Sequence, residues 1–403
     1  MTTSGKNAMS VRYLGVFFSV LSSLMPYVKT SPLESDIQPH FLVAFAIYFL
    51  AISRLNSSAY ITAIWIAVLY VFFGLMLQSY VDAPMLGMII IFTVALALED
   101  ARPISLAVKV AVAIYLLGII LELIGAAGFV EAVTSNQRGS VSRGYPSFTS
   151  EPSYLSIVSL VCLTWTLYTR QQVIWPILCF VLALFSGAIT GLAPLIVLWA
   201  LYSFRAINVF RVAVFLVLGS ALVGVGATLI DPGSRIAELT TILIDDPLYV
   251  FQDVSAANRL IRSIGPVYLA AQDWFVPHVA PSETDLFINW GFVSTRSDLY
   301  VERITNIASV LAYLYGIFAL PLLFVAWKNI RTPIFVFVAS IYLVFTNISI
   351  ATPYVCIVLS LLFRAKLSTP LIKSGYDQQV APTQAIGPKI TQASEAMRSR
   401  TTL

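Results

Sequence analysis

Residues 104–130, with the sequence ISLAVKVAVAIYLLGIILELIGAAGFV, form an apolar run of membrane-spanning length. About 20 consecutive apolar residues allow a helix to cross the hydrocarbon core of a bilayer. The two charged residues in the run, Lys109 and Glu122, lie toward its opposite ends, where their side chains can extend to the interfaces. The stretch therefore predicts a transmembrane helix.

The composition of the whole chain supports a membrane protein. Of its 403 residues, 58% are hydrophobic and only 11% are charged, whereas soluble domains carry about 25% charge. The three cysteines, Cys162, Cys179 and Cys356, lie inside apolar runs without the spacing of a disulfide framework or a metal site. The first apolar run is not followed by a small-residue cleavage site, so we expect it to be retained as a span.

Apolar runs recur along the chain and predict an all-α polytopic membrane protein with about 12 transmembrane helices. The predicted spans are residues 9–28, 40–53, 59–78, 84–98, 104–130, 152–169, 173–186, 190–204, 209–230, 306–327, 333–345 and 352–363. Two pairs are ambiguous. Residues 173–204 form either one long tilted helix or two helices that turn at Ser186-Gly187, and residues 333–363 leave the same choice near 347–353.

The distribution of cations predicts the orientation, because short cytoplasmic connections are enriched in Lys and Arg. With both termini in the cytoplasm, every short inner connection carries a cation, and Lys29 is the exception in the short outer connections. The inner segments then contain Lys6, Arg12, Arg54, Arg102, Arg170, Arg205, Arg211, Lys328, Arg331, Arg364, Lys366, Lys373, Lys389, Arg398 and Arg400.

Four regions follow from this layout. Residues 1–230 form a transmembrane bundle with a short outer loop at 131–151, and residues 231–305 form one large extracytoplasmic loop. The last three spans occupy residues 306–365, and residues 366–403 are expected to be a disordered cytoplasmic tail because they are rich in polar residues and proline. The large loop contains aromatic residues and helix-like stretches such as 255–271, so we expect it to pack on the membrane surface.

The large loop also contains two arginines that are three residues apart, Arg259 and Arg262. On a helix they share a face, and two guanidinium groups on one face suit a phosphate or diphosphate. The alternatives are contact with lipid headgroups and a surface ion pair with Asp253 or Asp246.

Residues 143–154, RGYPSFTSEPSY, place charged and hydroxyl groups where a span begins. Pro152 suits the first position of a helix, and Ser150 or Glu151 could cap it. A carboxylate beside Arg143 at the membrane boundary could instead act as a general base or bind a sugar hydroxyl.

The two histidines lie on the predicted outer side. His40 begins a span and is expected to be interfacial, whereas His278 lies in the large loop and is a second candidate base, with Asp273, Glu283 and Asp285 as acidic alternatives. The chain shows neither metal-ligand spacing nor a phosphate-binding glycine loop, so neither a metal nor a nucleotide cofactor is expected.

The stretch from Arg143 to Tyr154 resembles a signature of the O-antigen polymerase and ligase superfamily of bacterial polysaccharide assembly. In that superfamily it likewise follows about five spans and opens the next. The large outer loop with arginines and the stretch Tyr315-Gly316-Ile317 are similar as well. His278 is not followed by the Asn or Ser that is typical of ligases, which favours a polymerase.

The resemblance implies a metal-independent glycosyltransferase of the bacterial inner membrane. It would join undecaprenyl-diphosphate-linked oligosaccharide repeat units into O-antigen, capsule or exopolysaccharide, without ATP. Its partners would be this lipid-linked substrate, membrane lipid, a chain-length regulator and a flippase, but no nucleic acid. The predicted site contains Glu151 and His278 as catalytic residues and, as substrate-binding residues, Arg138, Arg143, Arg259, Arg262 and Asp285.

Two other functions stay open. A ligase of the same superfamily would transfer finished glycan to lipid A core or protein. A transporter or flippase of lipid-linked sugar would need charged residues along its spans, and the predicted spans carry almost none.

Overall fold

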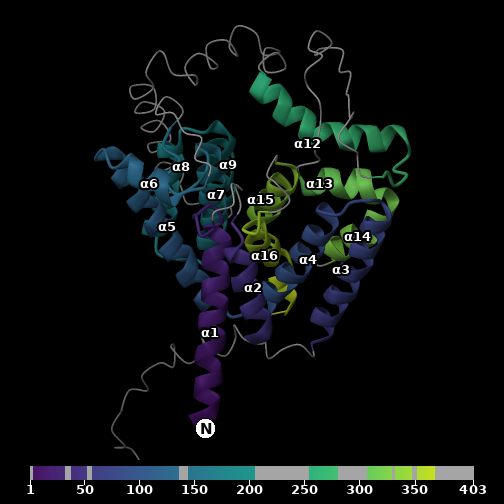
Figure 1. Ribbon diagram of the computed structural model, residues 1–403, viewed down its shortest axis with the longest axis horizontal. Coiled ribbons are helices and arrows are strands. Elements are labelled where there is room, and N and C mark those ends of the chain that lie inside the picture. Colours follow the sequence, from purple (N-terminus) through teal and green to yellow (C-terminus); the bar gives the residue numbers. More distant parts are fainter. Residues whose placement is uncertain are drawn as a thin grey trace, which may run out of the picture.

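The computed structural model describes residues 3–31, 38–51, 57–135, 144–204, 254–279, 306–328, 332–346 and 352–367. Throughout these ranges the regular elements are helices (Figure 1). The β structure within them is limited to one isolated antiparallel bridge between Val28 and Thr134. The predicted all-α class is therefore confirmed for the described part of the chain.

The described helices fall into three groups along the chain. The first group is α1 (Thr3–Leu24), α2 (His40–Ala51), α3 (Ser58–Met76), α4 (Asp82–Leu98), α5 (Ala101–Leu123) and α6 (Ala127–Val133). The second is α7 (Pro152–Tyr168), α8 (Ile174–Ser186), α9 (Ile189–Phe204) and α12 (Val254–Gln272). The third is α13 (Ile307–Ser309), the π-helix η3 (Val310–Tyr315), the 3₁₀-helix η4 (Gly316–Ala319), α14 (Leu320–Lys328), α15 (Ile334–Phe345) and α16 (Val355–Leu367).

Helix α7 is the central helix of the bundle. It packs against α5, α8, α9, α15 and α16, and nearly every side chain from Pro152 to Leu167 is buried. A helix that is apolar on all sides needs neighbours on all sides, and the composition of α7 meets that condition. The residue that precedes it, Glu151, is thereby held at one end of the molecular core.

Several outer helices expose large apolar side chains instead of covering them. On α3, for example, Trp65, Leu69, Phe72 and Met76 are all more than half exposed. Contiguous apolar surface of this kind is rare on soluble monomers and is typical of a surface that faces lipid.

Three helical stretches in the described residues are long and apolar enough to cross a membrane: Ser58–Met76, Ala101–Leu123 and Ile307–Val325. Shorter apolar helices accompany them, among them α4, α7, α8, α15 and parts of α1, α9 and α16. The predicted span at 209–230 lies outside the described residues. Of the predicted large loop the structure describes residues 254–279, and of the predicted tail it describes 366 and 367.

Two apolar runs of the sequence each form two helices. The apolar run 104–130 predicts one span, but α5 ends at Leu123 and α6 begins at Ala127. Gly125 has φ +85° between them, a value that glycine adopts without the steric cost of a Cβ. In residues 173–204 the structure has two helices, since Gly187 ends α8 in a left-handed conformation with φ +61°; the turn lies at Ser186-Gly187.

The predicted span over 306–327 contains a stretch that is long and apolar enough to cross a membrane, but it is not one regular helix. The first part of this run is a short α-helix that continues as η3, and the chain changes direction at Gly316, which has φ +49° and ψ −126°. Helix α12 packs on α13 and η3, and Figure 1 shows α12 above them while α14 turns away. Hydrophobicity alone could not reveal this interruption, because the apolar composition continues across it.

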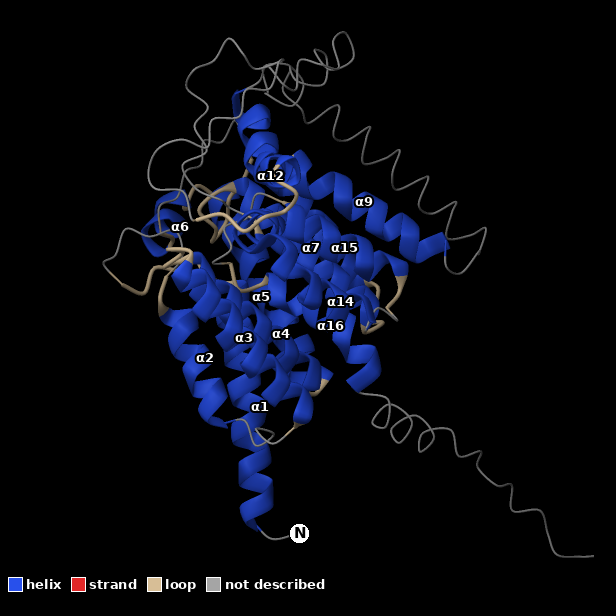
Figure 2. Ribbon diagram, turned by 90° about the vertical axis from the view of Figure 1, so that its right-hand side faces the viewer, coloured by secondary structure: helices blue, strands red, loops and turns tan. Residues whose placement is uncertain are grey.

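The bundle has two distinct ends. Figures 1 and 2 place α6 and α12 at the end opposite the N-terminus. We call this the distal end; it includes the end of α5, marked by Glu122, and the start of α7, marked by Glu151. The end that holds the first part of α1 and the junction of α4 with α5 is called the N-terminal end.

Candidate functional site

The polar segment from Gly144 to Glu151 enters the distal end as a tightly packed strap. The amide of Tyr145 donates to the carbonyl of Phe185 at 3.0 Å, and the two rings meet edge to face. Gly144 has φ +102°, and a Cβ at this position would overlap the carbonyl oxygen of Ser186. The strap is thus fixed to the end of α8 through its backbone.

The middle of the strap is fixed to α5. Ser147 has φ +52°; its amide donates to the Glu122 carboxylate at 3.2 Å and its hydroxyl donates to the Tyr115 carbonyl at 2.7 Å. Gly118 leaves the space that Ser147 and the Phe148 ring occupy. The sequence predicts a simple interfacial role for Glu122, but the structure gives its carboxylate a positioning role toward the strap.

Glu151 occupies the N-cap position of α7, and Pro152 follows at the start of the helix as predicted. The Glu151 side chain, however, makes no capping hydrogen bond. Ser150 does not provide the cap either, since its buried hydroxyl has no hydrogen-bond partner. Neither capping alternative is therefore realised, since the Glu151 carboxylate accepts no capping hydrogen bond from a main-chain amide of α7.

The Glu151 carboxylate is instead contacted by Ser153, whose hydroxyl donates to it at 3.2 Å. The Thr149 hydroxyl donates to the main-chain carbonyl of Glu151 at 2.8 Å. Glu151 is partly exposed whereas Thr149 is buried. A partly exposed carboxylate on a backbone that is held in place can accept a proton from a bound molecule, or a hydrogen bond from one of its hydroxyl groups.

Tyrosines surround the start of α7. The ring of Tyr154 stacks on that of Tyr27, with centroids 5.1 Å apart, and the Tyr27 hydroxyl lies 3.3 Å from the hydroxyl of Tyr354. The Tyr115 hydroxyl donates to the Leu24 carbonyl at 2.6 Å. These contacts join α7 to the end of α1, to α5 and to the start of α16, so the position of Glu151 depends on elements that are distant in sequence.

His278 lies in a second cluster, beyond the end of α12. Its ring stacks on Tyr313 at 4.4 Å; Nε2 is 3.0 Å from a carboxylate oxygen of Asp273, and Nδ1 is 3.3 Å from the Tyr313 carbonyl oxygen. Both ring nitrogens therefore lie within hydrogen-bonding distance of oxygen atoms. As a base, His278 would first have to give up one of these contacts.

The predicted site residues are brought together only in part. Within the described residues Glu151 contacts Ser153 of α7, whereas His278 contacts Asp273 after α12 and Tyr313 of η3; no hydrogen bond in this part of the chain joins Glu151 to His278. Arg138, Arg143 and Asp285 lie outside the described residues. Arg259 and Arg262 belong to α12, three positions apart and hence on one helical face, but their side chains lie outside the described part.

Sequence reasoning missed an ionic cluster at the N-terminal end of the bundle. Arg12 of α1 donates through two nitrogens to the buried carboxylate of Glu99, at 2.7 to 2.9 Å. Arg364 of α16 donates to the Glu99 carbonyl at 2.6 Å, and its guanidinium lies over the Trp165 ring. The acidic Glu99 at the end of a predicted span was the signal available in the sequence. The cluster joins α1, α4, α7 and α16 away from Glu151.

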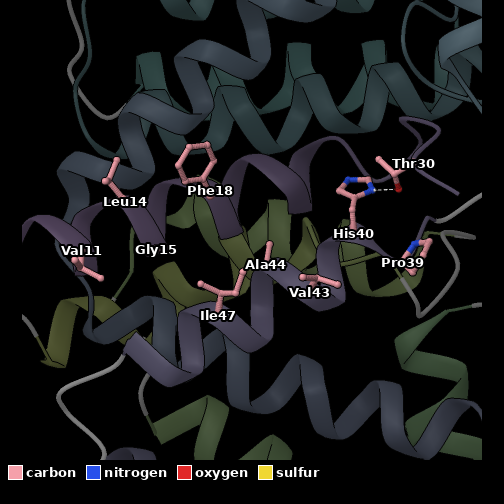
Figure 3. A pocket seen from close by; sticks show the side chains of 10 residues that line it. All are labelled: Val11, Leu14, Gly15, Phe18, Thr30, Pro39, His40, Val43, Ala44 and Ile47. Carbon is pink, nitrogen blue, oxygen red and sulfur yellow. Dashed lines mark hydrogen bonds between the residues drawn. The ribbon is translucent and has the colours of Figure 1, made fainter.

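A groove of about 590 Å³ runs between α1 and α2 (Figure 3). Its walls are apolar, and the polar pair at one end is Thr30 and His40, whose Oγ1 and Nδ1 atoms are 3.2 Å apart. Such a groove suits a hydrocarbon chain. The lining of this groove contains none of the predicted site residues. The candidate site is the strap with Glu151, where charged and hydroxyl groups lie together.

The described residues contain no group of three or more side chains that could hold a metal ion. The side chains that contact Glu151 carry hydroxyl groups, and a further carboxylate, Glu122, accepts a hydrogen bond from the Ser147 amide of the strap. The described part of the site therefore offers general acid–base and hydrogen-bonding chemistry.

Comparison of the chain with family models, with curated proteins and with solved structures gave no match.

Proposed function

We propose that this protein is a metal-independent membrane glycosyltransferase that polymerises undecaprenyl-diphosphate-linked repeat units at the outer face of the bacterial inner membrane. The product would be O-antigen, capsule or exopolysaccharide. The observation that carries the proposal is Glu151 at the start of the central helix: the Thr149 hydroxyl of the strap holds its main-chain carbonyl, and its carboxylate does not cap the helix.

The proposal includes the twelve-span topology with both termini in the cytoplasm. Under that topology the distal end faces the outside, where lipid-linked repeat units would arrive. The positions of α6 and α12, both opposite the N-terminus, are consistent with this orientation (Figure 2). The exposed apolar side chains of α3 support contact with lipid.

The proposed reaction transfers a glycosyl group between two lipid-linked chains. A hydroxyl of the acceptor unit attacks the anomeric carbon of the donor, the bond from that carbon to the diphosphate oxygen breaks, and a glycosidic bond forms. Glu151 takes the hydroxyl proton, while the lipid diphosphate leaves with the electron pair of the broken bond. The diphosphate bond supplies the energy, so the step needs no nucleotide.

In the proposed mechanism, arginines stabilise the leaving diphosphate. Charge develops on the leaving diphosphate, and guanidinium groups stabilise it by paired hydrogen bonds. We assign Arg143, Arg259 and Arg262 to the diphosphate or to an acidic sugar, with Arg138 and Asp285 as further substrate contacts. His278 remains the second candidate base, because Asp273 and Tyr313 hold its ring in place.

The test is a gel of lipid-linked and surface glycans from a deletion strain complemented with variants. Glu151→Gln keeps the size of the side chain but removes its basicity, so we expect polymer formation to fall by about 100-fold or more. Glu131→Gln is the matched control, because Glu131 is an exposed carboxylate on α6 at the same end of the bundle. It should give a normal ladder, and all variants should be present in the membrane fraction.

Each remaining outcome selects another function. Normal polymer from Glu151→Gln would reject this residue as the base. Long chains on the carrier lipid in the deletion strain would indicate the ligase instead. An unchanged glycan profile in the deletion strain would reject glycosyl transfer and favour transport of lipid-linked sugar.

A further inference from the structure

Helix α12 and the turn that follows it carry an exposed apolar surface that the proposed reaction does not use. Trp274 is 89% exposed, the highest value among the large hydrophobic side chains described. We call this surface the aromatic patch; it consists of Ile264, Tyr268, Trp274, Phe275, Val276 and Val279. Single exposed apolar residues are common on proteins, but six within sixteen positions indicate a surface that another molecule or a membrane buries.

The two patch residues within α12 lie on the side of the helix that faces away from the bundle. Pro266 and Ala270 are buried where the helix packs on α13 and η3. Ile264 and Tyr268 are four residues apart, so they share the other face. From Ile264 to Tyr268 the outward side of the helix therefore carries large apolar side chains, an arrangement that is unfavourable in water.

The turn that presents Trp274 is rigid. Trp274 and Phe275 both have left-handed backbone conformations, with φ +57° and +56°. The Phe275 amide donates to the Ala270 carbonyl at 2.6 Å, and the Phe275 carbonyl accepts from the Ile317 amide at 2.8 Å. Gly316 allows this approach, since a Cβ there would overlap the Phe275 carbonyl oxygen. The exposed indole is thus held outward by the fold.

We propose that residues 264–279 are an interfacial membrane anchor, with the aromatic patch inserted into the lipid leaflet at the distal end. Trp and Tyr are enriched at the boundary between headgroups and acyl chains, where an apolar ring and a polar N–H or O–H are both accommodated. Arg259 and Arg262 on the same helix would attract anionic headgroups. The occupant is therefore an anionic bilayer surface. The proposal depends on membrane placement and not on glycosyl transfer.

The anchor has a structural consequence. The turn is hydrogen-bonded to η3 and η4 at Tyr313 and Ile317, so a patch held in the leaflet would fix the interrupted helix at the same depth. It would also keep His278 and the two arginines of α12 at the level of lipid headgroups instead of in the aqueous compartment.

The experiment measures the depth of position 274 in the full-length protein. A nitroxide label is attached to Trp274→Cys in nanodiscs of phosphatidylethanolamine and phosphatidylglycerol, and its accessibility to oxygen is compared with that to a water-soluble nickel chelate. The native cysteines are buried, so the unsubstituted protein serves as the labelling blank. Gln272→Cys is the matched control, because Gln272 is exposed two residues away and is polar.

We expect the oxygen-to-nickel ratio to be several-fold higher at 274 than at 272, and higher with phosphatidylglycerol than with phosphatidylcholine alone. Equal ratios at both positions would overturn the anchor and leave Trp274 in water, where a soluble glycan could bind it. Protection of 274 from both reagents would also overturn it, since protein would then cover the patch.

A second measurement avoids the cysteine substitution. Brominated lipids quench tryptophans that lie in the bilayer, so the quenched fraction of the wild-type emission should exceed that of Trp274→Phe. An unchanged fraction would contradict the proposal even if the cysteine variants failed to fold.

Discussion

Gly144 shows how one residue fixes the path of the strap toward Glu151. Its φ of +102° and its contact with the Ser186 carbonyl leave no room for a side chain. We expect Gly144→Ala to lower the free energy of unfolding by about 1–3 kcal/mol, because the strain cannot be relieved without moving α8. Thermal unfolding in detergent measures this effect.

The control for Gly144 is Gly128 in α6. A Cβ at Gly128 meets nothing within 4 Å, and alanine is the better helix former by about 0.5–1 kcal/mol. Gly128→Ala should therefore leave the midpoint of thermal unfolding unchanged or raise it. If both variants lowered the free energy of unfolding equally, the close approach at Gly144 would not contribute to stability.

Residue types alone predicted where the central helix begins. The pair Glu151-Pro152 marked the start of a helix because proline suits that position, and the structure agrees. Whether the carboxylate caps the helix could not be predicted, because it depends on the strap and on Ser153. Likewise, nothing near His278 in the sequence indicates Tyr313, which lies 35 positions later and whose ring stacks on the imidazole.

At the scale of elements, helix existence was easier to predict than helix continuity. The predicted helix-like stretch 255–271 is observed as α12, from Val254 to Gln272. The interruption at Gly316 was missed because it is determined by contact with the turn after α12 rather than by local composition. Tyr70 reinforces it from α3, since its hydroxyl donates to the Phe318 carbonyl at 2.6 Å.

The close approach of Gly316 to the Phe275 carbonyl predicts how Gly316→Ala behaves. A methyl group there would overlap the Phe275 carbonyl, so the turn should separate from η3 and η4. We expect faster hydrogen exchange at the amides of residues 275, 278 and 317, whose partners lie across this contact or in the turn itself. Hydrogen exchange with mass spectrometry measures it.

Gly125→Ala is the matched control for this prediction. Gly125 also has positive φ, at +85°, but a Cβ there meets nothing within 4 Å. Gly125→Ala therefore introduces the backbone strain of a positive φ without a steric overlap with a neighbouring residue. If both variants left exchange at 275, 278 and 317 unchanged, the turn would not depend on Gly316.

At the scale of the molecule, the two ends of the bundle have separate tasks. The Glu99 cluster lies at the N-terminal end, and Glu151 lies at the distal end, with α1 extending from one region to the other through Arg12 and Tyr27. A change in the Glu99 cluster should therefore alter stability without altering the chemistry at Glu151. This separation would distinguish Glu99, as a structural carboxylate, from Glu151, whose catalytic role is proposed.

Glu99→Gln tests that separation. It leaves the Arg12 guanidinium partly buried without its counter-charge, and removal of one member of a buried pair costs about 3–5 kcal/mol. We expect a lower midpoint of thermal unfolding, together with a normal glycan ladder at a permissive growth temperature.

Asp100→Asn is the adjacent control, because Asp100 accepts a hydrogen bond from the Arg102 amide at the start of α5 and asparagine caps a helix equally well. Replacement of both Arg12 and Glu99 by methionine should recover part of the stability, since the Arg12 charge is then removed as well, while the buried Arg364 still lacks the Glu99 carboxylate. A lost ladder in a stably folded Glu99→Gln protein would contradict the separation and place Glu99 in the reaction.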